Sequence, residues 1–152
     1  MFVSFEGLDE FQQRLMQIQA RRENPLELME DILQEMSQSI NLTFNLEGRP
    51  ERWTDRTTGG DWPILHKTGH LHNATISTLP GDDSIAGVEI GAQESLAEIG
   101  TYVYYGKYHQ HPDHLAHLDQ GIMPIRRFLL FFPNELVSWC EKIRQFLWWG
   151  RL

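Results

Sequence analysis

Residues 24–46 read NPLELMEDILQEMSQSINLTFNL, and this stretch decides how the rest of the chain is organised. Pro25 suits the first position of a helix, where its missing N–H group would have no partner in any case. Residues 41–46 alternate polar and apolar as a strand does, yet Phe44 continues the helical spacing, so the helix is predicted to run to about Leu46. The apolar side chains that recur at helical spacing are Leu26, Met29, Ile32, Leu33, Met36 and Ile40.

A shorter helix is predicted before it, from Gly7 to Arg22. Acidic residues open this segment and Arg21 and Arg22 close it, which suits the dipole of a helix. Residues 1–46 are therefore predicted to form an N-terminal pair of helices. The apolar positions of the first helix are Leu8, Phe11, Leu15 and Ile18, spaced by three and four.

Strand signals follow in the middle of the chain. Residues 74–79 (ATISTL) and 84–91 (SIAGVEIG) flank PGDD, a turn typical of antiparallel strands, so Thr75–Ile90 is predicted to form a hairpin. Residues 124–132 (PIRRFLLFF) are predicted to form a buried strand. Residues 101–110 (TYVYYGKYHQ) fit either a strand or a short helix.

The end of the chain predicts a closing helix that begins at Pro133 or Asn134. The sequence as a whole predicts a single α+β domain over residues 1–152. It has two N-terminal helices, a small antiparallel sheet built around a hairpin, and a C-terminal helix packed on that sheet. The C-terminal helix is expected to bury Leu136, Val137, Cys140, Ile143 and Leu147.

Composition limits the classes of function. The chain has 152 residues, of which 41% are hydrophobic and 22% charged, as in ordinary globular domains. Its net charge of −8 disfavours adhesion to nucleic acid or to anionic lipid, since both depend on clustered Lys and Arg. Cys140 is the only cysteine, which fits a reducing compartment. No apolar run approaches the roughly 20 residues of a membrane span, so no membrane partner is predicted.

Residues 108–117, YHQHPDHLAH, carry four histidines: His109, His111, His114 and His117. A zinc site needs three or four converging ligands, and a short helix here would supply His114 and His117 as a pair three residues apart. The chain has no HExxH motif and no second cluster at a recognised spacing. A polar loop is therefore the favoured interpretation, with no metal and no cofactor, and a small metal-dependent hydrolase is the alternative.

Motifs for other chemistry are absent from the sequence. It contains no GxSxG, no GxGxxG and no GxxxxGK[ST], so neither a hydrolase nucleophile nor a phosphate-binding loop is indicated. We therefore expect no catalytic and no cofactor-binding residues, and a protein that is not an enzyme.

Four residues are candidates for an interface: Arg126, Arg127, Trp148 and Trp149. The two arginines should point to opposite faces of an extended segment, and a buried guanidinium should have a carboxylate or several carbonyl acceptors. Arg127 also fits a charge that protects an edge strand. Adjacent tryptophans on a helix point about 100° apart. Either one of them meets another chain, which would make residues 148–152 an interaction tail, or they fold back on the first helix.

Five short motifs occur in an order that resembles the phage virion morphogenesis family, the tail-completion proteins of Mu-like and P2-like bacteriophages. The resemblance extends over roughly residues 8 to 147. The family has a His-Gln motif with a structural role, which His109 and Gln110 match in this sequence. The three later histidines correspond to a variable loop of the family. Arg127 departs from the pattern, since the family commonly has Pro there. The motifs are RPERW (49–53), ILHKTGHLHNATI (64–76), VEIGA (88–92), YYGKYHQ (104–110) and MPIRRFLLF (123–131).

The resemblance implies a structural assembly protein of a tailed-phage virion, acting in tail completion or head–tail joining. It implies a homo-oligomeric ring at the neck, with a hexamer favoured, that contacts other neck, connector and tail proteins. Genomic DNA would pass through the lumen without sequence-specific binding. The protein would be made in the host cytoplasm and end in the virion. A tail terminator or stopper that contacts the tail tube is the alternative within this class.

Overall fold

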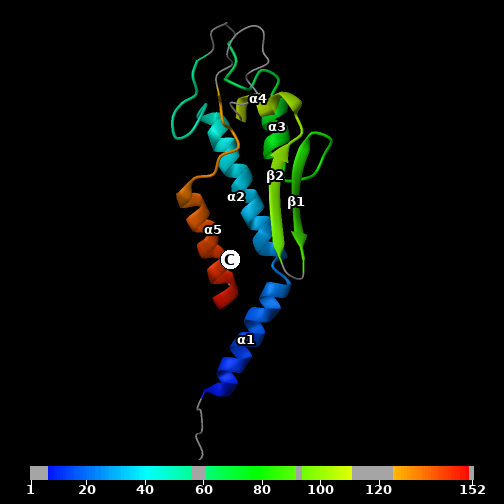
Figure 1. Ribbon diagram of the computed structural model, residues 1–152, viewed down its shortest axis with the longest axis vertical. Helices are drawn as coiled ribbons and strands as arrows, with labels where there is room; N and C mark the ends of the chain where they lie inside the picture. Colours follow the sequence, from blue (N-terminus) through cyan, green and yellow to red (C-terminus); the bar gives the residue numbers. More distant parts are fainter. Residues whose placement is uncertain (1–6, 56–60, 92–93, 111–124, 151–152) are drawn as a thin grey trace, which may run out of the picture.

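The computed structural model describes residues 7–55, 61–91, 94–110 and 125–150 of the chain (Figure 1). The fold is α+β, as predicted, with two N-terminal helices, a two-stranded antiparallel sheet and a C-terminal helix. The elements in chain order are α1 (Leu8–Glu23), α2 (Leu26–Asn45), α3 (His70–Ile76), β1 (Ser84–Ile90), β2 (Ser95–Thr101), the 3-10 turn η1 (Tyr104–Gly106), α4 (Lys107–Gln110) and α5 (Pro133–Trp149).

Helix α2 is the central element. It contacts β1, β2 and α3 on one side and α5 on the other (Figure 1). Most of its predicted apolar row is covered, since Ile32, Leu33 and Ile40 are buried, but Leu26 at its start is 44% exposed. The helix ends at Asn45, so the predicted helical course of residues 41–46 is confirmed.

Helix α1 is separated from α2 by Asn24 and Pro25 and extends away from the body of the molecule (Figure 1). Its bounds match the predicted ones to within one residue at each end. None of its 16 residues is buried, although it carries the apolar row expected of a packed helix. The row is therefore largely without a partner in the described part of the chain.

The hairpin exists, but the sequence predicted the wrong pair of strands. Strand β1 pairs with the following β2, in a register that runs from Ser84 opposite Thr101 to Ile90 opposite Ser95. The segment expected as the first strand instead forms α3. There Leu71, His72, Ala74 and Thr75 are buried, a spacing that lies on one side of a helix and cannot lie on one face of a strand.

Residues 125–132 are extended but belong to no strand, which corrects the predicted buried strand. Side chains alternate as in a strand: Arg126 and Phe128 are buried, whereas Arg127 is exposed. The backbone partners come from α4 instead of a neighbouring strand. The Arg126 N–H donates to the His109 carbonyl at 3.0 Å, and the Phe128 N–H donates to Gln110 Oε1 at 3.0 Å.

The ambiguous residues 101–110 are helical beyond Val103, in η1 and α4. The core lies between α2, α3 and the extended segment. The Phe44 ring is its centre, with the rings of Trp53 and Phe128 at centroid distances of 5.8 and 5.4 Å. The buried apolar members are Ile40, Phe44, Trp53, Ile64, Leu71, Ala74, Val103 and Phe128.

Helix α5 forms where it was predicted, but it is rotated about its axis relative to the prediction. Of the residues expected to be buried, only Leu147 is half-buried and the others are exposed. The remaining side chains that turn inward are Phe132, Glu135, Trp139, Lys142 and Phe146. Two of these are charged, and both have ionic partners on or near α2, which is why a charged face packs inward. Helix α5 contacts α1 and α2, and α2 separates it from the sheet (Figure 1), so it does not pack on the sheet as expected.

Among the described helices, none has the length and apolar content needed to cross a bilayer.

Candidate assembly interface

Helix α1 presents an apolar row to solvent. Leu8, Phe11 and Leu15 are 51%, 59% and 49% exposed, and they follow one another at spacings of three and four. Such a row normally lies against a core or another helix. Large apolar side chains scattered singly on a surface need no explanation, but a continuous row on one helix marks a contact surface.

Helix α5 presents a second apolar row, which begins in its first turn. Leu136, Val137 and Cys140 are exposed on it at spacings of three and four, and Ile143, 37% exposed, lies at its edge, where it lines a hollow with Leu28 and Met29 of α2. These residues were predicted to be the buried face. They are exposed because Glu135 and Lys142, which bond to Ser39, Asp31 and Glu35 of α2, turn another side of α5 toward α2.

Two contacts hold α1 against the end of α5. The guanidinium of Arg14 lies 4.8 Å from the ring centroid of Trp149 and 5.5 Å from that of Trp148, within cation–π range. The Arg21 side chain donates a hydrogen bond to the carbonyl of Leu147 at 2.9 Å. The tandem tryptophans therefore fold back on the first helix and still remain 51% and 63% exposed. Both lie in the last turn of α5.

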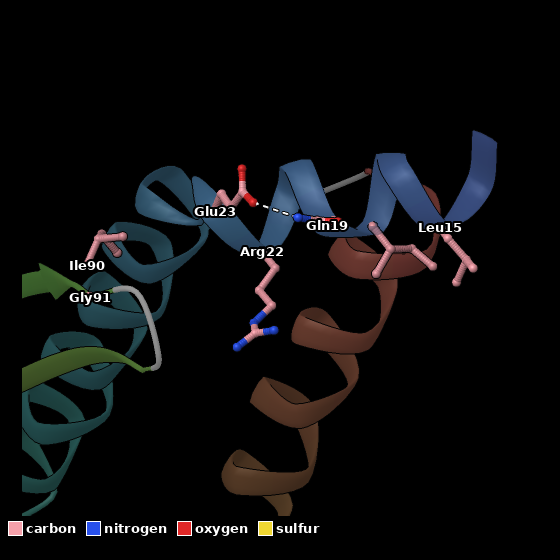
Figure 2. A pocket seen from close by; sticks show the side chains of 7 residues that line it. Leu15, Gln19, Arg22, Glu23, Ile90 and Gly91 are labelled. Atoms are coloured by element: carbon pink, nitrogen blue, oxygen red, sulfur yellow. Dashed lines mark hydrogen bonds between the residues drawn. The ribbon is translucent and has the colours of Figure 1, made fainter. Parts of the chain in front are cut away.

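A groove separates α1 from the tip of the β1–β2 hairpin. Its cavity of about 600 Å³ is lined by the last turns of α1 and by Ile90 and Gly91. Figure 2 shows Gln19 donating to Glu23 along α1 and Arg22 extending into the space between the hairpin and α5. Leu15 stands farther along α1, at the outer end of the groove. The described contacts thus hold α1 from Arg14 to its C-terminal end and leave its first turns without a partner among the described residues.

The first turn of α5 is fixed by an ionic cluster around Glu135. Its carboxylate accepts hydrogen bonds from the Phe132 N–H at 2.8 Å, the Ser39 hydroxyl at 2.7 Å and Arg49 at 3.1 Å. Burial alone would raise the pKa of Glu135, but these donors and the Arg49 charge together lower it below its ordinary value. The guanidinium of Arg49 also lies 4.7 Å from the Phe132 ring centroid.

The middle of α5 is fixed by Lys142, which bonds to two carboxylates of α2. Its ammonium contacts Asp31 and lies 2.6 Å from Glu35 Oε1. The hydrogen bonds to Asp31 and Glu35 raise the pKa of Lys142. Residues Glu135 and Lys142 are seven positions apart, so both project from the same side of α5. Together they set the rotation that turns the aliphatic row outward.

Arg126 and Arg127 lie elsewhere. The extended segment that carries them is at the opposite end of the body from the C-terminal end of α5 (Figure 1). Arg126 is buried and donates from Nε and Nη2 to the Thr54 carbonyl at 3.2 and 2.9 Å, so one carbonyl accepts both bonds where a carboxylate or several carbonyls were expected. The carbonyl of Arg127 accepts from the indole of Trp53 at 3.2 Å. Both contacts anchor the loop that contains Trp53 and Thr54. Neither contact involves Trp148 or Trp149.

Two histidines are buried in the described part of the chain. His72 donates from Nε2 to Asn41 Oδ1 at 2.8 Å, and its Nδ1 has no hydrogen-bond partner among the described residues. Burial, and then the neighbouring His66, lower the pKa of His72. His109 is buried in α4.

The other histidines of the cluster, at positions 111, 114 and 117, lie outside the described residues. Within the ranges that the structure describes, no group of three or more His, Cys, Asp or Glu side chains is placed to hold a metal ion.

The sequence predicted the tryptophans of this surface but missed the rest. Arg14 was not singled out, although it lies between Phe11 and Ile18 on the helix and is the group that contacts both indoles. The aliphatic row of α5 was noticed but assigned to the core. The sequence did contain a signal for a second contact surface, because α5 has more apolar residues than one packed face needs.

Comparison with known proteins returned no match to a family model, to a curated protein or to a solved structure.

Proposed function

We propose that this chain is a structural subunit of a tailed-phage virion that assembles with copies of itself at the neck, in tail completion or head–tail joining. The observation that carries the proposal is α1, a 16-residue amphipathic helix with no buried residue. A helix of this kind is stable mainly through tertiary packing of its apolar face. A partner molecule supplies that packing. The order of the five sequence motifs supports the phage setting.

A ring is the assembly that suits two different exposed surfaces. Head-to-tail contacts join one patch to another, and they generate rings when the rotation closes. Helices α1 and α5 offer two such surfaces on one chain, with distinct sequences. A hexamer is the symmetry favoured by the resemblance, and other neck, connector and tail proteins are its proposed neighbours.

The distribution of charge supports DNA passage without binding. Helix α1 has three acidic and three basic residues, and α5 has two of each, so both are neutral and the net charge of −8 lies wholly outside them. Subunits can therefore meet at these helices without local repulsion. The acidic remainder of the ring repels phosphate and lets the genome slide through the lumen.

The test has two parts. Light scattering of the purified full chain over a range of concentrations gives the copy number, and electron microscopy shows whether the oligomer is a ring. Localising a tagged chain in the virion then separates the neck from the tail tube. A chain that stays monomeric and is absent from virions would refute the proposal. A position on the tail tube would favour the terminator alternative, and metal-dependent turnover would favour a hydrolase.

A further inference from the structure

We infer that α1 of one copy docks along the outward face of α5 of the next copy. The inference rests on the proposed self-assembly and names the surfaces that carry it. Both helices have an unpartnered apolar row at the spacing of three and four that lets two helices pack side by side. Helix α1 carries Leu8, Phe11 and Leu15, and α5 carries Leu136, Val137 and Cys140.

The contact cannot form within one copy. The Arg14 and Arg21 side of α1 is already occupied by the end of α5, through the indole and carbonyl contacts described above. These contacts leave α1 pointing away from the body (Figure 1), beyond the C-terminal end of α5. The outward row of α5 runs back toward Leu136, on the part of the helix that lies alongside α2. Within one copy, α1 reaches only the Leu147 end of α5, where Arg22 and Ile143 line a common hollow. A single α1 therefore meets Leu136, Val137 and Cys140 only on another copy.

The exposed area is large enough for a specific interface. Nine large apolar side chains of the two helices are between 37% and 68% exposed. Together they expose roughly 900 Å², taking on the order of 150 to 250 Å² for a fully exposed large side chain. Specific interfaces bury about 1,200 to 2,000 Å² in total, of which about 60% is apolar. About two fifths of this area lies on Met16, Trp148 and Trp149, outside the two rows. Pairing the rows of α1 and α5 thus accounts for about half of the apolar area of one such interface.

The charges favour a protein partner over a membrane. Amphipathic helices that lie on anionic membranes are rich in Lys and Arg on the polar face. Helix α1 is neutral, with Asp9 and Glu10 in its first turn. Helix α5 is neutral as well. The neutral faces of α1 and α5 can therefore associate, whereas the acidic remainder of one copy repels the acidic remainder of another.

The natural cysteine gives a direct test, because Cys140 lies on the outward row of α5 and is the only cysteine of the chain. A chain with Gln12→Cys and Cys140→Ala is mixed with an equal amount of tagged wild-type chain and treated with a short bismaleimide. Gln12 borders the α1 row, one helical turn from Leu8 and Leu15. The matched control is Gln13→Cys with Cys140→Ala, on the other side of α1. We expect a covalent heterodimer with the first chain and little or none with the control.

A second pair of variants tests the row without crosslinking. Leu15→Glu places a charge in the docked row, and Leu79→Glu places the same charge on a 73% exposed leucine outside it. Both should keep the wild-type circular dichroism spectrum. Leu15→Glu should raise the concentration for half-association at least about tenfold, the factor expected for losing one buried leucine, and Leu79→Glu should leave it unchanged.

The outcomes separate this inference from the proposed function. Self-association with equal crosslinking by both cysteine chains, or through Cys140 to Cys140 alone, overturns the α1–α5 docking and leaves the assembly proposal standing. A chain that is monomeric at every concentration overturns the docking, and if it is also absent from virions it overturns the proposed function as well. Binding of the monomer to anionic phospholipid vesicles through α1, without self-association, also overturns the docking.

Discussion

Arg49, just after α2, forms an ion pair with Glu135, in the first turn of α5, across an Nη2–Oε1 distance of 3.1 Å. Their side chains are only 16% and 17% exposed, so both charges depend on each other and on Ser39 for hydrogen bonds. This pair sets where α5 begins and, with Lys142, which of its faces turns outward. The ionic contacts of Glu135 and Lys142 therefore both stabilise the fold and keep the apolar row of α5 exposed.

Replacing Glu135 with Gln should destabilise the protein by about 2 kcal/mol, since the mostly buried Arg49 loses its counter-charge. Because the pKa of Glu135 is lowered in the folded state, its stabilisation is present above the ordinary value of 4.5 and is lost as the pH falls below it. Urea denaturation at neutral and acidic pH measures both effects. Glu141→Gln, which breaks the exposed pair with Arg144, is the control and should unfold like the wild type. Equal loss in both variants would contradict this role.

His72 should make stability depend on pH in a higher window. Burial lowers its pKa below the ordinary value of 6.5, so below that pH the unfolded chain takes up a proton that the folded chain does not. The free energy of unfolding should therefore fall as the pH drops from 6.5 toward the folded pKa, by up to about 1.4 kcal/mol per pH unit. His72→Gln keeps a donor for Asn41 and should remove this slope. A variant with the wild-type slope between pH 7.5 and 5.5 would rule out His72 as its source.

Phe128→Ala should cost about 3 to 5 kcal/mol, the usual range for a buried aromatic. Phe128 is 1% exposed and its ring packs on Phe44, which confirms its predicted place in the core. Thermal melts of the variant and the wild type give the shift. Leu79→Ala, on a leucine that is 73% exposed, should melt as the wild type does. An unchanged melting temperature for Phe128→Ala would mean that the segment is not held in the core.

Removing residues 148–152 should weaken self-association and leave the monomer folded. Trp148 and Trp149 contact Arg14 but no residue of the core, so the core should not depend on them. Circular dichroism and light scattering of the truncated and full chains make the comparison. Arg14→Gln is a milder variant that removes the cation and keeps both indoles. If the truncated chain unfolds, the tryptophans are part of the core. If it associates normally, they have no part in assembly.

Replacing His111, His114 and His117 together with Ala should leave fold and assembly intact, because the sequence supplies no complete ligand set around them. Circular dichroism, light scattering and elemental analysis are the measurements. About one zinc per chain in the wild type, lost in the triple variant, would restore the metal-site alternative.

Local sequence pattern predicted the helices well and the long-range pairing poorly. The bounds of α1, α2 and α5 follow from periodicity and from proline and acidic residues at their starts. Residues 74–76 were placed in a strand because they alternate apolar and polar. Over so few residues this alternation also fits a helix, and only the burial of Leu71 and His72 decides in favour of the helix. The rotation of α5 was not predictable from hydrophobicity, since ion pairs with residues about 100 positions away hold its charged face inward.

The extended segment at residues 125–132 has a kinetic consequence. The Phe128 amide is bonded to the Gln110 side chain, and Gln110 donates in turn to the Leu129 carbonyl at 3.2 Å. A side-chain clamp of this kind opens by rotation of one glutamine and does not require the β1–β2 ladder to separate. In hydrogen–deuterium exchange the Phe128 amide should therefore exchange through local opening, sooner than the ladder amides of β2 and independently of global unfolding.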